Sequence, residues 1–300
     1  MTGRRATLRR GPVPAFAPIF ALAFALAFAL VLSLLPGGSL LAQSLGSSFG
    51  AAGSDQPITI QAEEGIEWQQ RAQVYIARGN AVAQSGEVTV RADELTAFYR
   101  ETSASDTEIY RLEARGNVRI ATPNENATGD LAVYDVEQGV LVITGDDIQF
   151  RTPTETITAE QSLEYWEAAG LAVARGNAVA NQDGKRLRAD VISAHMREDQ
   201  AGRFGVNRVE AFGDVQIQTA TEFVRADYGD YRTESGIAAL SGSVKITQGP
   251  NQINGDFAEV NLNTGVSRLL GRPSVSSGKT GGGKARVNGI FIPNSKPNGS

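Results

Sequence analysis

The side chains that most often carry out catalysis are scarce in this sequence. It contains one histidine, His195, and no cysteine. Nucleophilic catalysis by serine or cysteine requires a neighbouring base, usually histidine, and zinc sites are built from clusters of histidine and cysteine. An internal repeat, described below, places Phe98 at the position equivalent to His195. A position that also holds an aromatic hydrocarbon is typical of packing on a strand face, so we expect neither a catalytic histidine nor a metal site.

Carboxylates are abundant, and a pair of them can hydrolyse a glycosidic bond. Asp146 and Asp147 have the composition of a calcium ligand pair, but the equivalent residues in the second half are Ser243 and Val244. Four other aspartates recur once per repeating unit, whereas a catalytic pair is normally a single constellation. We interpret these four as devices that shape turns or strand ends: Asp93, Asp130, Asp190 and Asp227. The sequence therefore predicts a protein that is not an enzyme and that uses no cofactor.

Residues 1–42 have the composition of an export signal. Four arginines precede an apolar run from Ala15 to Leu35, Pro36 ends the run, and Ala42 offers the small residue that a signal peptidase needs. We therefore expect export with cleavage near Ala42. Because the apolar run is long enough to cross a bilayer, an uncleaved membrane anchor is the alternative.

The charge of the exported part excludes one class of partner. Residues 1–42 carry four arginines and no acid, so the rest of the chain has 24 basic and 33 acidic residues and a net charge of −9. Nucleic-acid binding depends on clustered Lys and Arg that neutralise phosphates, and we expect no nucleic-acid partner. Without cysteine there are no disulfides, so the fold depends on its core and its backbone hydrogen bonds.

The chain contains a tandem duplication with an offset of 97 residues. Residues 59–80 read TIQAEEGIEWQQRAQVYIARGN and residues 156–177 read TITAEQSLEYWEAAGLAVARGN, with ten of 22 positions identical and no gap. The same offset continues to match downstream, for example Tyr134 with Tyr231. Such self-similarity is the signature of a repeat architecture.

Within each half, a marker glycine followed by Asn or Asp introduces a segment with apolar residues two positions apart, as at Val118 and Ile120. This period predicts half-buried strands, and we assign the glycine pairs, which tolerate positive φ, to turns. A few short strands cannot bury their own apolar face, so we expect the units to stack into an all-β sandwich or open roll with a continuous interior. We divide the chain into residues 1–42 (signal), 43–56 (flexible segment), 57–153 (first repeat domain), 154–272 (second repeat domain with an extra unit) and 273–300 (linker, final strand and tail).

Several short motifs follow one another in a recognisable order. Pro57-Ile58-Thr59-Ile60 precedes an acidic stretch, Gly79-Asn80-Ala81-Val82-Ala83 forms the first marker, and Ala92-Asp93-Glu94-Leu95 begins a further strand. Leu240-Ser241-Gly242 and a last strand ending at Pro293 complete the series. Behind an export signal, this order resembles the OstA-like (organic-solvent-tolerance) family of periplasmic lipopolysaccharide-transport bridge proteins, over essentially all of residues 57–293.

The resemblance implies an elongated β-jellyroll folded as a V-shaped, stacked-strand sandwich that holds acyl chains of lipopolysaccharide between its sheets. It implies a periplasmic carrier or bridge that helps move lipopolysaccharide from the inner to the outer membrane, with components of the transport machinery at both membranes as partners. It also implies head-to-tail joining through edge strands. The chain departs from the family in length, because it holds two copies of the domain and a partial third, which leaves the oligomeric state open.

From the alternation of apolar residues we predict a lipid-binding groove. Its predicted residues are Val82, Val90, Val118, Ile120, Val133, Val142, Val179, Val215 and Ile217. We place the partner-docking edge strands at Ile58 and Ile60 near the beginning and at Val287, Ile290 and Ile292 near the end. Three alternatives remain: an inner-membrane-anchored partner of the same transport system, a β-helical adhesin or polysaccharide lyase, and a non-catalytic cell-envelope scaffold with a filled interior.

Overall fold

The computed structural model describes residues 58–103, 106–198, 204–261, 264, 266–270 and 287–290. Within these residues the chain forms 18 strands that belong to a single antiparallel sheet, which confirms the predicted all-β fold. The expected signal (residues 1–42), the segment 43–56 and Ile292 lie outside the described residues. In the part of the chain that the structure describes, no helix is long and apolar enough to cross a bilayer.

The strands follow one another along the chain with short connections. They are β1 (Thr59–Gln61), β2 (Gly65–Gln69), β3 (Val74–Ser85), β4 (Val88–Ser103), β5 (Asp106–Ala121), β6 (Asn126–Asp135), β7 (Val140–Thr144), β8 (Ile148–Arg151), β9 (Glu155–Ala159), β10 (Ser162–Trp166), β11 (Leu171–Gln182), β12 (Lys185–Glu198), β13 (Phe204–Gln218), β14 (Glu222–Arg232), β15 (Ile237–Gln248), β16 (Asn251–Asn261), β17 (Val266–Leu270) and β18 (Asn288–Ile290).

Five of the marker glycines lie inside strands, so their assignment to turns between strands is wrong, whereas Gly145 lies between β7 and β8. In β3, β5, β11, β13 and β15 the glycine and the residue after it both have positive φ, and the pairing register shifts there. Two such residues insert a bulge that bends a strand without ending it. The pairs are Gly79-Asn80, Gly116-Asn117, Gly176-Asn177, Gly213-Asp214 and Gly242-Ser243.

These bends fold the sheet into two layers. Ala114 and Ile120 lie on either side of the bend in β5, yet both belong to one cluster of buried side chains. A flat sheet has no such shared interior, so each long strand contributes one arm to each layer. At the ends of the stack the arms are separate strands: β1 and β2 pair with opposite ends of β3, and β17 and β18 with opposite ends of β16.

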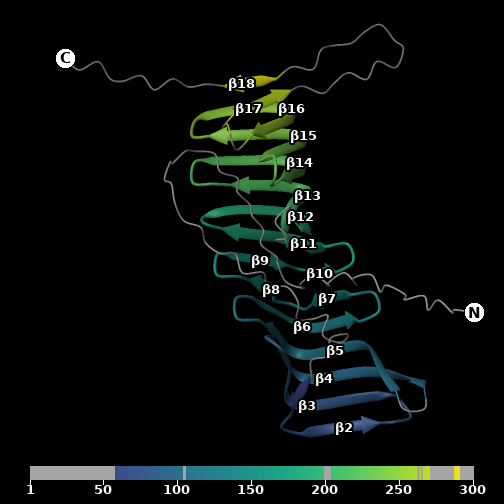
Figure 1. The fold of residues 1–300 in the computed structure, drawn as a ribbon. Coiled ribbons are helices and arrows are strands. Elements are labelled where there is room, and N and C mark those ends of the chain that lie inside the picture. Colours follow the sequence, from purple (N-terminus) through teal and green to yellow (C-terminus); the bar gives the residue numbers. More distant parts are fainter. Residues whose placement is uncertain are drawn as a thin grey trace, which may run out of the picture.

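The two repeats join without interruption. Strand β7 pairs with β10, and β8 pairs with β9, so the sheet is continuous across the predicted boundary between residues 153 and 154. The buried cluster likewise runs from Val88 to Val260. Figure 1 shows the resulting elongated stack, with β2 near one end and β18 at the other. The edges of the sheet therefore lie at opposite ends of the molecule.

Small side chains fill much of the interior of the second repeat. Ala172, Ala174, Ala178 and Ala180 of β11 all belong to the buried cluster, and each is at most 2% exposed. Val179, between two of them, points to the other face because successive side chains of a strand alternate. Alanines on the inner faces let the two layers approach closely, as close packing of the interior requires.

Candidate functional site: an apolar cleft between the layers

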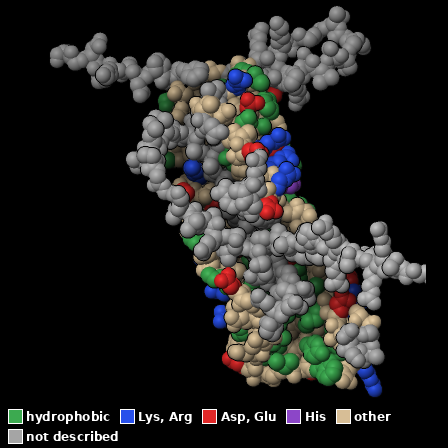
Figure 2. All heavy atoms as spheres, viewed as in Figure 1, with side chains coloured by type: hydrophobic (Ala, Val, Ile, Leu, Met, Phe, Trp, Pro, Cys, Tyr) green, Lys and Arg blue, Asp and Glu red, His purple; other side chains and the backbone are tan. Residues whose placement is uncertain are grey.

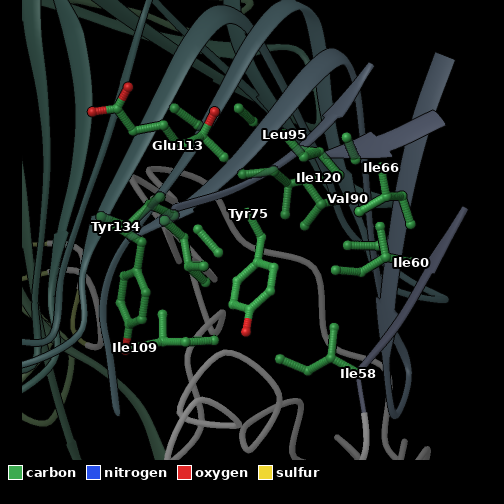
Figure 3. A pocket seen from close by; sticks show the side chains of 18 residues that line it. Ile58, Ile60, Ile66, Tyr75, Val90, Leu95, Ile109, Glu113, Ile120 and Tyr134 are labelled. Atoms are coloured by element: carbon green, nitrogen blue, oxygen red, sulfur yellow. The ribbon is translucent and has the colours of Figure 1, made fainter. Parts of the chain in front are cut away.

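An apolar cavity lies between the two layers at the β2 end. Its volume is about 380 Å³, and its walls include Ile60 of β1, Ile66 of β2, Val90 and Leu95 of β4, and Ile120 of β5. Figure 3 shows these side chains converging on the space from both layers. The volume lies within the usual range for pockets that bind small apolar ligands.

The cleft lies at the end of the sheet, where apolar side chains are exposed. Ile58, Ile60, Ile66 and Trp68 are large apolar residues of the first two strands and their approach, and between 37% and 55% of each is exposed. Figure 2 shows hydrophobic side chains at the surface of this end of the molecule. Contiguous apolar exposure on a folded protein marks a site for a ligand or a partner.

Charge is almost excluded from the walls. Among the described residues that line the cleft, Glu113 alone is charged. Its carboxylate forms salt bridges with Arg111 and with Arg115, the latter at 2.7 Å between Nη2 and Oε2. Glu113 stands between Leu112 and Ala114, which line the cleft, so alternation directs its paired carboxylate to the opposite face and the cleft presents an apolar interior.

An aromatic cluster stands at one side of the cleft. Tyr75 lines it, and its ring lies 5.7 Å from that of Trp68 and 5.0 Å from that of Tyr99, measured between ring centroids. The indole Nε1–H of Trp68 donates a hydrogen bond of 2.7 Å to the hydroxyl of Tyr99. Ring contacts and this hydrogen bond fix the three side chains relative to one another.

Tyr134 closes the inner end of the cleft, where the first repeat meets the second. Its hydroxyl donates a hydrogen bond of 2.7 Å to Oε1 of Glu167, which follows β10. Burial, followed by the bond to Glu167, raises the pKa of the Tyr134 hydroxyl, so it remains a donor at all physiological pH values. Burial also raises the pKa of its neighbour Tyr165 to about 12.

Beyond this point the interior is nearly closed. A space between the layers of the second repeat, lined by Leu187, Val215 and Ile217 among others, has a volume of only about 20 Å³. The latter two side chains are 1% and 4% exposed. This part of the interior resembles a filled core.

The structure brings some of the predicted groove residues together and separates others. Val90 and Ile120 line the cleft. Val118, Val215 and Ile217 are buried between the layers without lining the cleft.

Four predicted groove residues lie on the opposite face of the sheet, so their expected inward position is wrong. Each stands between two neighbours that line the cleft or are buried, and alternation therefore directs it away from the interior. They are Val82, Val133, Val142 and Val179. On this sheet alanine and tyrosine often point inward where valine points outward, which apolar character alone does not reveal.

Sequence reasoning also missed several lining residues. Ile66, Tyr75, Leu95 and Leu112 all line the cleft. The strand register is the signal that could have found them. Ala77 pairs with Ile66 on one side and with Leu95 on the other, so the three side chains share one face of the sheet. A small residue between two larger ones on adjacent strands is therefore informative here.

The predicted docking residues lie at both ends of the stack. Ile58 and Ile60 are more than one-third exposed at the β1 end, and Val287 and Ile290 are 40% and 59% exposed at the β18 end. Among the described strands, β1 pairs with β3 alone and β18 with β16 alone. Each end therefore presents an edge with exposed apolar side chains.

The residues considered for chemistry lie away from the cleft. Nε2 of His195 is 2.8 Å from Oε2 of Glu210, in a shallow outer depression lined by Val173 and Phe212. The described residues contain no group of three or more His, Asp or Glu side chains placed to hold a metal ion. Charged side chains on the outer face form ion pairs between neighbouring strands, for example between Arg208 Nε and Asp230 Oδ1 at 2.9 Å.

The fold and the cleft define the class of protein: an elongated, tandem-repeat β-protein with an apolar interior that is open at one end. The family model described as "LptA/(LptD N-terminal domain) LPS transport protein" matches residues 59–163 and again residues 156–266. The chain therefore belongs to this family of lipopolysaccharide-transport proteins, which are transport components.

The chain was also compared with solved structures and with curated proteins. A solved structure that is similar to this chain is that of LptH, described as the LptA-homologous periplasmic component of the lipopolysaccharide transport device of Pseudomonas aeruginosa. The identity is 10%, the match covers 80% of this chain and 97% of that one, and the TM-score is 0.21. No curated protein matches the chain.

Proposed function

We propose that this protein is a non-catalytic periplasmic carrier that holds acyl chains of lipopolysaccharide in the cleft between its layers and helps pass them from the inner to the outer membrane. The observation that carries the proposal is the apolar cleft of about 380 Å³ at the open end of a chain that belongs to a lipopolysaccharide-transport family.

The energetics favour acyl chains as the ligand. Moving a methylene group from water into an apolar site contributes about 0.8 kcal/mol. An acyl chain with about ten buried methylenes would thus gain about 8 kcal/mol before the entropy of ordering is subtracted. The cleft supplies aliphatic walls, and its one charged residue is already paired.

The proposal also accounts for the surface and the ends of the molecule. After the expected cleavage near Ala42 the chain has a net charge of −9, which supports solubility of a protein with an exposed apolar opening. The open edges at β1 and β18 supply backbone groups to which a partner can add a strand. We assign these edges to transport components at the two membranes, and to head-to-tail contact with a second copy.

Lipopolysaccharide binding by the purified protein tests the proposal. Val90→Asp places a carboxylate in the cleft, whereas Arg91→Asp places one on the exposed opposite face of the same strand. Burying an unpaired charge is costly, so we expect Val90→Asp to weaken binding at least tenfold and Arg91→Asp to leave it within about twofold. Circular dichroism confirms that both variants are folded. Equal binding by both variants, or no binding by the unaltered protein, would leave a scaffold as the better interpretation.

A further inference from the structure

The two repeats place equivalent residues in the same register, which permits a comparison within one molecule. In the first repeat Trp68 pairs with Tyr75, and Tyr75 pairs with Ala97. In the second, 97 residues later, Tyr165 pairs with Ala172, and Ala172 pairs with Ala194. The irregularity before Tyr99 in β4 also recurs, before Met196 in β12. Each lining residue of the first repeat therefore has a structural counterpart in the second.

The aliphatic lining is similar in both repeats, but only the first encloses a roomy cleft. Ile60 and Ile66 are 37% and 55% exposed, whereas their counterparts Ile157 and Leu163 are 0% and 9% exposed. The cavity volumes are about 380 Å³ and about 20 Å³. Three further aliphatic pairs differ by little in size: Val90 with Leu187, Leu95 with Ile192, and Leu112 with Val209. Leu141, which also lines the open cleft, is larger than its counterpart Ala238. The size of these aliphatic residues therefore does not explain the difference in volume.

The clear difference lies in the aromatic cluster. Tyr75 is replaced by Ala172 and Tyr99 by Met196, so two of the three rings are missing from the second repeat. The counterpart of Trp68 is Tyr165, which is 3% exposed. Figure 3 shows Tyr75 projecting into the cleft. Tyr99 is only 2% exposed, so the cluster has a buried base beneath the ring that projects.

We propose that Tyr75 and Tyr99, held in place by Trp68, determine which of the two equivalent interiors is open to ligand. The rings belong to the layer that contains β2. Tyr75 lies farther from the bend at Gly79 than Ala77 does, and at this distance from the bend the rings hold the two layers apart. Shorter side chains nearer the bend then cannot meet across the gap, which leaves the cleft. In the second repeat an alanine occupies the corresponding place, and the layers close until the interior is packed.

Distances between the layers test this proposal without any ligand. Because the chain has no cysteine, spin labels attach only at introduced ones. Gln84 and Glu101 are exposed positions on the two arms of the first repeat, and Asn181 and Glu198 are their exposed counterparts in the second. Double electron–electron resonance on each pair of cysteine substitutions reports the separation of the arms. We expect the first pair to be farther apart than the second.

The decisive variant gives the first repeat the residues of the second. Tyr75→Ala combined with Tyr99→Met should shorten the first distance towards that of the second pair. Tyr75→Phe combined with Tyr99→Phe keeps the rings and removes the acceptor of the Trp68 hydrogen bond, and it should leave the distance unchanged. Ala172→Tyr should lengthen the second distance, and circular dichroism reports whether each variant is folded. An unchanged first distance in a folded Tyr75→Ala/Tyr99→Met variant would overturn the proposal and assign the opening to the position of β1 and β2 at the end of the sheet.

A ligand measurement links this proposal to the proposed function. Only this expected effect on binding rests on the proposed function; the distance measurements do not. With a fluorescent C12 fatty acid as the probe, we expect the Tyr75→Ala/Tyr99→Met variant to bind at least tenfold more weakly than the unaltered protein. A shortened distance together with no probe binding by the unaltered protein would keep the aromatic determinant and contradict the carrier function. Strong probe binding by the unaltered protein, together with an unchanged distance in the Tyr75→Ala/Tyr99→Met variant, would support the carrier function and contradict the aromatic determinant.

Discussion

Gly116 stands directly against Asp93: a Cβ placed on Gly116 would lie 2.2 Å from Oδ2 of Asp93. The side-chain amide of Asn117 donates to the same oxygen at 2.9 Å. The carboxylate thus packs against the bend in β5, which is a structural role for an aspartate that recurs in every unit. The relationship is repeated between Gly213 and Asp190 and between Gly242 and Asp227.

Gly116→Ala should destabilise the protein substantially. The residue has a φ of +74°, which costs a non-glycine residue about 1–2 kcal/mol, and the added methyl also meets Asp93. We expect the free energy of unfolding to fall by about 2–4 kcal/mol in chemical denaturation. Gly184→Ala is the control, because Gly184 has a φ of +75° but open space around it, and about 1 kcal/mol should be lost. Equal losses at both positions would show that the contact with Asp93 has no energetic consequence.

Truncation of equivalent isoleucines should separate the open from the closed interior. Ile157 is 0% exposed, and Ile157→Ala should cost about 2–5 kcal/mol of unfolding free energy, as expected for a cavity in a packed core. Ile60 holds the same place in the first repeat but is 37% exposed, so Ile60→Ala should cost about 1 kcal/mol. Thermal and urea unfolding of both variants measure the difference. A larger loss at Ile60 would contradict an open cleft at the β1 end.

Glu125 should make stability depend on pH. Burial raises the pKa of its carboxyl to about 8, and its Oε2 is buried without a hydrogen-bond partner among the described residues. The folded protein therefore keeps a proton that the unfolded chain releases above its ordinary pKa, and stability falls as pH rises from about 4.5 to about 8. Glu125→Gln removes this titration, so it should raise the melting temperature at pH 8 relative to the unaltered protein but not at pH 4. The same difference between the two proteins at both pH values would contradict a buried, protonated Glu125.

The exposed edges should support association between copies. Ile58→Lys combined with Ile60→Lys adds charge to the β1 end, and inward or edge charges oppose strand addition. We expect this variant to sediment as a monomer at concentrations at which the unaltered protein associates. Gln84→Lys, on an exposed part of β3, serves as the control and should not change the sedimentation profile. An equally associated double variant would move the contact away from β1.

Much of the fold could be predicted because duplication and alternation are visible in the residue pattern. The offset that matches Tyr134 with Tyr231 gave the repeat, and apolar residues two apart indicated strands. The location of the bends could not be predicted in the same way. Gly79-Asn80 has the composition of a turn, and only the pairing of residues on both sides of it shows that β3 continues through it.

The candidate site was predicted less well than the fold. The alternation of apolar residues divides a strand into two faces but does not show which face points to the interior. Val179, for example, is only 9% exposed although it lies outside the core cluster. An outward side chain can thus be as buried as an inward one. The contrast between an open and a closed repeat depends on Tyr75 and Ala172, whose effect appears only when both layers are in place.

Site-specific photo-crosslinking tests the carrier function most directly. A photoreactive residue at Ile120 would face the cleft, and one at Arg119 would lie on the exposed opposite face of the same strand. After irradiation with lipopolysaccharide, we predict an adduct at Ile120 and none at Arg119. Adducts of equal yield at both positions, or none at Ile120 in a folded protein, would contradict acyl-chain binding between the layers.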